Sequence, residues 1–144
     1  MKAISSPLSA GSIIVFSLVF LSSCGLKWGS ASPNDTAPTG GTIVAQGSFT
    51  SLNGRTAGGT VQIYDMGTST IVRLVGVTFP AESGLQLSVT GDGAVVSTTT
   101  LLATTGSKNY TISASGVSTW NSVTIHSLPK NLDYAQALLS KALW

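Results

Sequence analysis

The sequence predicts an all-β fold: a single antiparallel β-sandwich or barrel-like domain that follows an export signal and a flexible tether. After Thr42, short β-branched runs recur at intervals of about ten residues. Glycine and asparagine turn signals separate these runs, and helical periodicity is almost absent. Serine and threonine are abundant, which suits half-solvated strands better than helices. A length of 144 residues fits one domain.

Eight strands are expected in chain order. They are Thr42 to Phe49, Gly59 to Tyr64, Thr70 to Val77, Leu85 to Thr90, Val95 to Leu102, Asn109 to Ser113, Ser122 to Leu128 and Tyr134 to Leu139. The alternation is clearest in the fourth strand, where Leu85, Leu87 and Val89 are expected to face the core. Val61 and Ile63 repeat this pattern in the second strand.

The last segment allows two readings from its residues alone. A helical stripe would also fit its apolar residues, and helix propensity favours that reading. These residues are Leu132, Ala135, Leu138, Leu139 and Ala142.

The N-terminus has the pattern of an export signal. Lys2 precedes a run of nine residues from Ile13 to Leu21, apolar except for Ser17, which is too short to cross a hydrocarbon layer of about 30 Å as a permanent membrane helix. The run ends in Leu21-Ser22-Ser23-Cys24, which resembles a bacterial lipobox. We therefore expect residues 1–23 to be a signal peptide and Cys24 to carry lipid, palmitate included.

The expected domain boundaries follow from composition. Residues 24–41 are small, polar and rich in turn formers, so we expect a flexible tether after the lipidated cysteine. We expect residues 42–144 to form the β-sandwich domain. Several acyl chains would hold the protein on a membrane, and Gly25 after the cysteine favours the outer membrane, facing the periplasm or the cell surface.

Composition excludes several kinds of site. Only 8% of residues are charged and the net charge is +2, so the chain lacks the basic patch of a nucleic-acid binder. One cysteine cannot form an internal disulfide, and one histidine cannot supply the usual metal cluster. We expect a monomer without a cofactor and without nucleic acid as a partner.

Several pieces of the chain, taken in order, resemble the DM-thirteen domain family between about Gly47 and Leu139. The similar pieces are Gly47-Ser48-Phe49, Gly59-Thr60-Val61-Gln62-Ile63, Phe79, Gly84-Leu85-Gln86-Leu87, Gly106, Tyr110-Thr111-Ile112, Ser122-Val123-Thr124-Ile125 and Tyr134-Ala135-Gln136-Ala137-Leu138-Leu139. The resemblance implies a β-rich module of bacterial lipoproteins with an electron-transfer role. It also implies that the ending from Tyr134 to Leu139 is a strand.

The chain departs from this family at two places. His126 and Ser127 stand where members usually have Trp and then Cys, and Leu85-Gln86 stands where they often have Pro-Asp. The cysteine to which the redox role is attached is therefore replaced by Ser127. Cys24 is committed to lipid, so no thiol remains for thiol chemistry.

A few residues are candidates for chemistry or binding. Alternation places His126 and Thr124 on the strand face opposite Val123 and Ile125, where they are candidate ligand or interaction residues. A haem or copper site would have only His126 and Met66 to draw on. No G-x-S-x-G elbow appears, so hydrolase chemistry is disfavoured.

Other polar and aromatic residues are expected to support the fold. Asp65, Asp92 and Asp133 lie near turn signals, where carboxylates usually cap the backbone. Trp120 and Tyr110 are expected in the core or at its rim, with a ligand stack as the alternative.

The function expected from these residues is that of a membrane-anchored cell-envelope lipoprotein. Its non-catalytic domain is expected to act by contact with a protein or a surface polymer. A redox accessory role, as the family resemblance implies, is the alternative. A plain structural spacer is the third reading.

Overall fold

The computed structural model describes residues 34–143, and every regular element in that range is a β-strand. The eight expected strands are all present, so the all-β prediction is confirmed. The strands are β1 (Thr42–Ser51), β2 (Gly58–Asp65), β3 (Thr70–Thr78), β4 (Leu85–Gly91), β5 (Ala94–Thr100), β6 (Thr105–Ile112), β7 (Trp120–Ser127), β8 (Leu132–Leu138) and the short β9 (Ser140–Lys141). The segment at Tyr134 forms β8, as the strand reading predicted.

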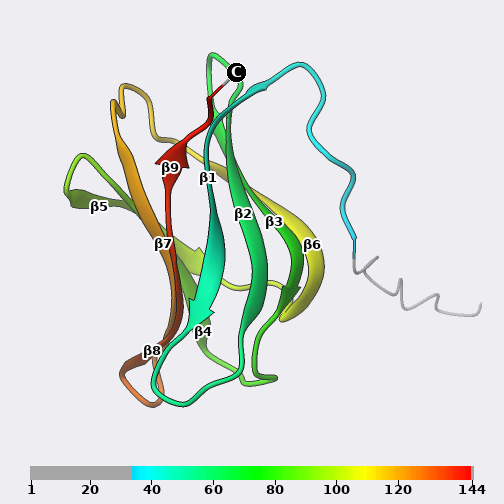
Figure 1. Ribbon diagram of the computed structural model, residues 1–144, viewed down its shortest axis with the longest axis vertical. Coiled ribbons are helices and arrows are strands. Elements are labelled where there is room, and N and C mark those ends of the chain that lie inside the picture. Colours follow the sequence, from blue (N-terminus) through cyan, green and yellow to red (C-terminus); the bar gives the residue numbers. More distant parts are fainter. Residues whose placement is uncertain (1–33, 144) are drawn as a thin grey trace, which may run out of the picture.

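The strands form one curled antiparallel sheet in the order β5-β4-β7-β8-β1-β2-β3-β6, with β9 paired to β1 outside this path. Figure 1 shows that the sheet curves into a half-barrel, whose outermost strands are β5 and β6. A sandwich or barrel-like domain was the predicted architecture, and the curled sheet agrees with it.

Strand β1 joins the two halves of the sheet. Its residues from Thr42 to Ser48 pair with β2, and its last three residues pair with β8. Gly47 lies where the neighbour on the other side changes from β9 to β8, and a Cβ atom there would collide with the Leu138 carbonyl oxygen. A residue without a side chain is therefore required at this corner.

The core lies inside the curl, and alternation along the strands explains which residues reach it. Leu85, Leu87 and Val89 of β4 are at most 2% exposed, and Val61 and Ile63 of β2 are fully buried, as predicted. The rings of Phe49 and Phe79 add an edge-to-face contact, with centroids 5.0 Å apart.

Strand β6 begins four residues earlier than predicted. Its first residues, Thr105 to Lys108, lack apolar alternation, but β3 supplies antiparallel partners for three of them. Pairing with a neighbour therefore extends the strand beyond what its own sequence indicates.

The last part of the expected tether is attached to the domain. Asn34 forms a parallel bridge with Ser107, and the Arg73 guanidinium donates to the carbonyl oxygens of Asp35 and Thr36 at 3.1 and 2.9 Å. The Asp35 carboxylate accepts from the Asn109 amide and from Lys108. These contacts cover part of the free edge of β6, which would otherwise expose unpaired backbone groups.

Candidate functional site

One end of the half-barrel is filled by a polar network, and we call it the closed end. Glu82, in the β3–β4 loop, accepts hydrogen bonds from Ser127, Lys130 and the Tyr134 hydroxyl. Tyr134 is fully buried, and the Arg55 guanidinium lies 5.0 Å from the centre of its ring. These bonds, led by those from Lys130 and Tyr134, lower the pKa of Glu82 from 4.5 to about 2. The carboxylate is therefore ionised at neutral pH and fixed by three donors.

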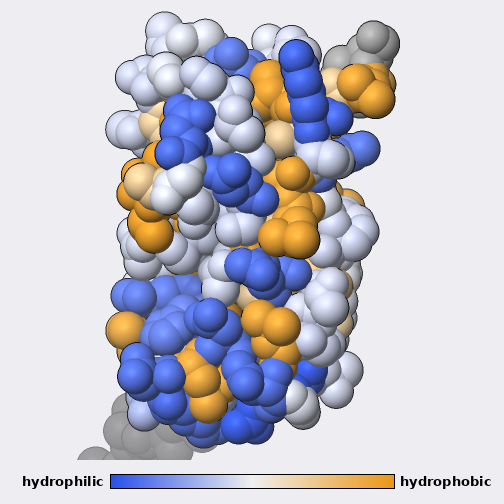
Figure 2. Space-filling view, turned by 60° about the vertical axis from the view of Figure 1, so that its left-hand side comes forward, coloured by the Kyte–Doolittle hydropathy of each residue, from blue (hydrophilic) through white to orange (hydrophobic). Residues whose placement is uncertain are grey.

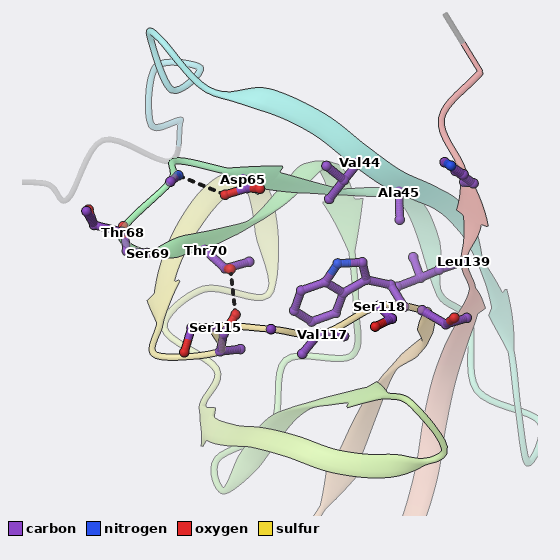
Figure 3. Close-up of a pocket in the computed structure, with 16 residues that line it drawn as sticks. Val44, Ala45, Asp65, Thr68, Ser69, Thr70, Ser115, Val117, Ser118 and Leu139 are labelled. Carbon is purple, nitrogen blue, oxygen red and sulfur yellow. Dashed lines mark hydrogen bonds between the residues drawn. The ribbon is translucent and has the colours of Figure 1, made fainter.

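The opposite end, which we call the open end, contains a pocket of about 420 Å³. Its walls come from the β2–β3 hairpin at residues 66–69, the β6–β7 loop at residues 113–119, the start of β1 and the segment after β8. Figure 3 shows Val44 and Ala45 of β1 on one side, with Val117 and Ser118 of the β6–β7 loop facing them. Mouths of curled sheets are a usual place for ligand sites.

A β-bulge in β7 brings an aromatic ring into this pocket. Thr90 pairs with Ser122, but the next residue, Gly91, pairs with Trp120, so Asn121 is the extra residue. Without the bulge Trp120 would share the outward face of Ser122 and Thr124. With it, Trp120 takes the inward position opposite Gly91 and lines the pocket, half-buried at the rim of the core.

The bulge is held from both sides. The Asn121 side-chain oxygen accepts from the Gly93 amide at 2.8 Å, and its carbonyl oxygen accepts from the Leu139 amide at 2.9 Å. The first bond ties the bulge to the β4–β5 hairpin and the second ties it to the end of β8. The position of Trp120 is thus set by the scaffold.

The β6–β7 loop is also fixed to its neighbours. The two carboxylate oxygens of Asp92 accept from the amides of Ser118 and Thr119. The Thr70 hydroxyl donates to the Ala114 carbonyl oxygen, a bond drawn as a dashed line in Figure 3. Val117 lies directly against Gly91, where an added Cβ would come within 2.5 Å of its Cγ1. The loop therefore forms a preformed wall rather than a loose flap.

The lining combines an apolar side with a set of hydroxyls. The apolar members are Val44, Ala45, Ala114, Val117, Trp120 and Leu139. The hydroxyl members are Thr68, Ser69, Thr70, Ser115, Ser118 and Thr119. Of these six hydroxyls, only that of Thr70 bonds to another protein group within the described residues. Asp65 and Lys141 contribute one charge of each sign.

The predicted interaction residues lie elsewhere, on the outer face of β4, β5, β7 and β8. Thr124 and His126 are both half-buried there, and Figure 2 shows a mixed surface on this side, with apolar spots separated by hydrophilic ones. The His126 Nδ1 atom lies 2.8 Å from the Asp133 carboxylate, and Thr124 is 3.4 Å from the Gln136 amide nitrogen. Polar cross-strand pairs of this kind also occur on ordinary solvated sheets.

The structure separates His126 from Met66. His126 lies level with the end of β1 at Ser51, whereas Met66 follows Asp65, which pairs with Thr42 at the start of β1. Nine residues of strand separate these levels, or about 30 Å. His126 and Met66 therefore lie too far apart to bind one metal ion together. No cluster of three or more His, Cys, Asp or Glu residues suited to a metal occurs between residues 34 and 143.

The other residues singled out from the sequence support the fold in different ways. Asp65 caps a turn as expected, since it accepts from the Gly67 amide at 2.8 Å. Asp92 instead accepts from the amides of Ser118 and Thr119 in a distant loop, and Asp133 bonds to His126. Tyr110 is in the core, where burial raises the pKa of its hydroxyl. Ser127 is buried against Glu82. Cys24 lies outside the described residues, and lipidation stays a prediction.

Sequence reasoning did not find the pocket. Its hydroxyl residues belong to turns, where serine and threonine are common for local reasons, so they carry no individual signal. The one signal in the sequence was Trp120 directly after the Gly116 loop, because a large aromatic residue in a polar loop region has to be buried against something.

Comparisons with protein-family models, with curated proteins and with solved structures found no match. Among the described residues, no helix is long and apolar enough to span a membrane.

Proposed function

We propose that this chain is a lipid-anchored protein of the bacterial cell envelope whose β domain binds a ligand at its open end and catalyses no reaction. Cys24 carries the lipid and holds the protein on a membrane, most simply the outer membrane. The ligand is part of an envelope protein or surface polymer, which the domain contacts as a monomer.

The pocket at the open end is the observation that carries the proposal. It is bounded by four segments far apart in sequence, and hydrogen bonds from Asp92, Asn121 and Thr70 fix its walls. The closed end is occupied by the Glu82 network, and the pocket lies at the opposite end of the half-barrel. A preformed concave site with apolar and polar lining is the usual form of a binding site.

The place where the tether joins supports the same reading. Asn34 meets β6 at Ser107, whereas the open end of β6 is at Ile112, five residues further along, or about 17 Å. Figure 1 shows this segment rising beside β6 before it reaches β1. Residues 34–41 run on to the start of β1 at the open end, but none of them lines the pocket, which is therefore free to meet a partner.

The carboxylates of the domain support a binding role over a catalytic one. Glu82, Asp92 and Asp35 each accept hydrogen bonds from the scaffold and do not line the pocket. The lining carboxylate, Asp65, bonds to the Gly67 amide and to no lining hydroxyl among the described residues, so the pocket holds no bonded pair of a nucleophile and a base. Nucleophilic catalysis needs such a pair within hydrogen-bond reach. The redox alternative loses its one ligand pair, because His126 and Met66 lie at different ends of the sheet.

The anchor is tested by expressing the full chain with labelled palmitate. We expect label on the wild type and none on Cys24→Ala, with Ser23→Ala, which keeps a small residue before the cysteine, as the matched control. Equal label on the wild type and Cys24→Ala would overturn the lipoprotein assignment.

Binding is tested with the full lipoprotein in detergent and lipid-extracted envelope material from the native host. We expect Trp120→Ala to reduce retention on this material at least tenfold and Thr124→Ala to leave it within twofold. Loss with Thr124→Ala alone would place the contact on the outer face, and no retention of the wild type would overturn the proposed function.

A further inference from the structure

We propose that the pocket at the open end binds a neutral saccharide of one or two pyranose rings. The inference rests on the proposed function and names the ligand class of the same site. Three features of the lining select this class: an aromatic and apolar wall, a set of unengaged hydroxyls, and the absence of net charge.

The apolar wall suits the face of a sugar ring. Trp120 is turned inward by the bulge at Asn121, and Val44, Val117 and Leu139 line the same pocket. A pyranose with equatorial hydroxyls presents carbon-bound hydrogens on its face, and these are weakly positive. The face of an indole is negative, so the two surfaces attract each other and both leave water.

The hydroxyls of the pocket distinguish a saccharide from a lipid. Thr68, Ser69, Ser115, Ser118 and Thr119 each offer a donor and acceptor that no described protein group uses. An acyl chain would cover these groups and leave the buried ones without hydrogen-bond partners, which disfavours its binding. A sugar, whose rim carries hydroxyls of both roles, can bond to them.

The charges of the pocket favour a neutral sugar. Asp65 and Lys141 balance each other, so neither an anionic nor a cationic ligand meets a net opposite charge. One Asp65 oxygen accepts from the Gly67 amide at 2.8 Å, and the other is available to accept from a sugar hydroxyl.

The size of the pocket limits the length of the ligand. Its volume of about 420 Å³ lies toward the small end of ligand sites, which run from about 300 to 1,000 Å³. The site therefore holds one or two rings, and a longer polymer would enter it with an end or a side branch.

The proposal is tested by titration of the full lipoprotein, held in a detergent without a sugar headgroup. The probes are methyl β-glucoside, cellobiose and N,N′-diacetylchitobiose, observed by saturation-transfer NMR and calorimetry. Sorbitol is the control ligand, because it carries hydroxyls without a ring face, and decanoate probes the lipid alternative. We expect at least one cyclic probe to bind tenfold or more tightly than sorbitol.

Variants tie the binding to the pocket. Trp120→Ala is expected to weaken it at least tenfold, and Trp120→Phe, which keeps an aromatic face, to stay within about threefold of the wild type. Thr124→Ala on the outer face is expected to change nothing. Asp65→Asn, at an exposed turn, serves as a second pocket variant should Trp120→Ala prove unstable, and it is expected to weaken binding severalfold.

The outcomes separate this inference from the proposed function. Equal binding of sorbitol and the cyclic probes, or binding of decanoate alone, overturns the saccharide assignment. Retention on envelope material that depends on Trp120, combined with no binding of any saccharide, also overturns it but leaves the proposed function standing. Loss of retention and of saccharide binding in the wild type overturns both.

Discussion

At the scale of single residues, the domain depends on a few polar side chains that join distant segments. Glu82 bonds to Ser127, Lys130 and Tyr134, which lie 45 to 52 residues further along the chain. No local pattern marks this glutamate, because its role is set by which loops meet at the closed end. Sequence reasoning therefore found the strands around it but not the network.

The lowered pKa of Glu82 predicts how the stability of the fold depends on pH. Its value of about 2 in the folded protein is below the ordinary 4.5, so the unfolded chain binds a proton more readily in this interval. The stability from this carboxylate is complete above about pH 4.5 and is lost as pH falls toward 2. Glu82→Gln is expected to be less stable at pH 7 and to lose less stability on acidification.

Thermal unfolding followed between pH 7 and 2 measures this effect. The stability of Glu82→Gln is still expected to fall somewhat with pH, because the pKa of Asp35 is also lowered. The bond from the Asn109 amide is the main cause of this shift, and the bond from Lys108 is the next. Asp35→Asn is therefore the matched control, and the double variant should show the shallowest slope. An unchanged slope in Glu82→Gln would contradict the network at the closed end.

A substitution at Gly91 is expected to change the shape of the pocket. A methyl group at this position would come within 2.5 Å of Val117 Cγ1, so Gly91→Ala should push the β6–β7 loop outward or against Trp120. We expect a loss of about 1 to 3 kcal/mol in unfolding free energy and a weaker pocket ligand. Gly93→Ala is the comparison, since open space surrounds that glycine but its φ of 79° strains alanine. Unchanged stability in Gly91→Ala would contradict the contact, and lost stability with unchanged ligand binding would contradict its effect on the pocket.

At the scale of the strands, the sequence was most informative where alternation is regular. In β4 every second residue is buried, and the prediction of Leu85, Leu87 and Val89 as core residues is confirmed. It was least informative where a neighbour decides the geometry. The bulge in β7 arises because the register between β4 and β7 shifts by one residue at Asn121. The sequence of neither strand alone indicates this shift.

The register of β4 gives a test of the core. Leu85 is 2% exposed and Gln86 faces outward. Leu85→Asp buries an unpaired carboxylate and should cost about 3 to 5 kcal/mol, whereas Gln86→Asp should stay within about 1 kcal/mol. Chemical denaturation measures both. Equal losses in the two variants would mean that the register of β4 is wrong.

The edge of β6 gives a second test at this scale. Arg73 holds residues 35 and 36 through two carbonyl bonds and also donates to Asn109 at 2.8 Å. Arg73→Ala should release this segment, so the amide hydrogens of Ser107 and Asn109 should exchange faster. Hydrogen exchange read residue by residue measures this, with Arg55→Ala at the closed end as the control. Faster exchange of these amides in Arg55→Ala alone would contradict the role of Arg73 in holding residues 35 and 36.

At the scale of the whole molecule, the half-barrel has two ends that differ in structure. The closed end is held by charged and buried groups, and the open end carries a preformed pocket with unengaged hydroxyls. The fold class was predictable because β-branched alternation runs through the chain. The site was not, because it is assembled from turns that only the curled sheet brings together.

Amide and indole NMR spectra of the labelled lipoprotein, recorded during titration with solubilised envelope polymer from the native host, test most directly whether the domain binds at its open end. We predict shifts at the Trp120 indole N–H and at the amides of residues 66–69 and 113–119. Shifts confined to Thr124, His126 and their neighbours on the outer face, or no shifts at any polymer concentration, would contradict the account.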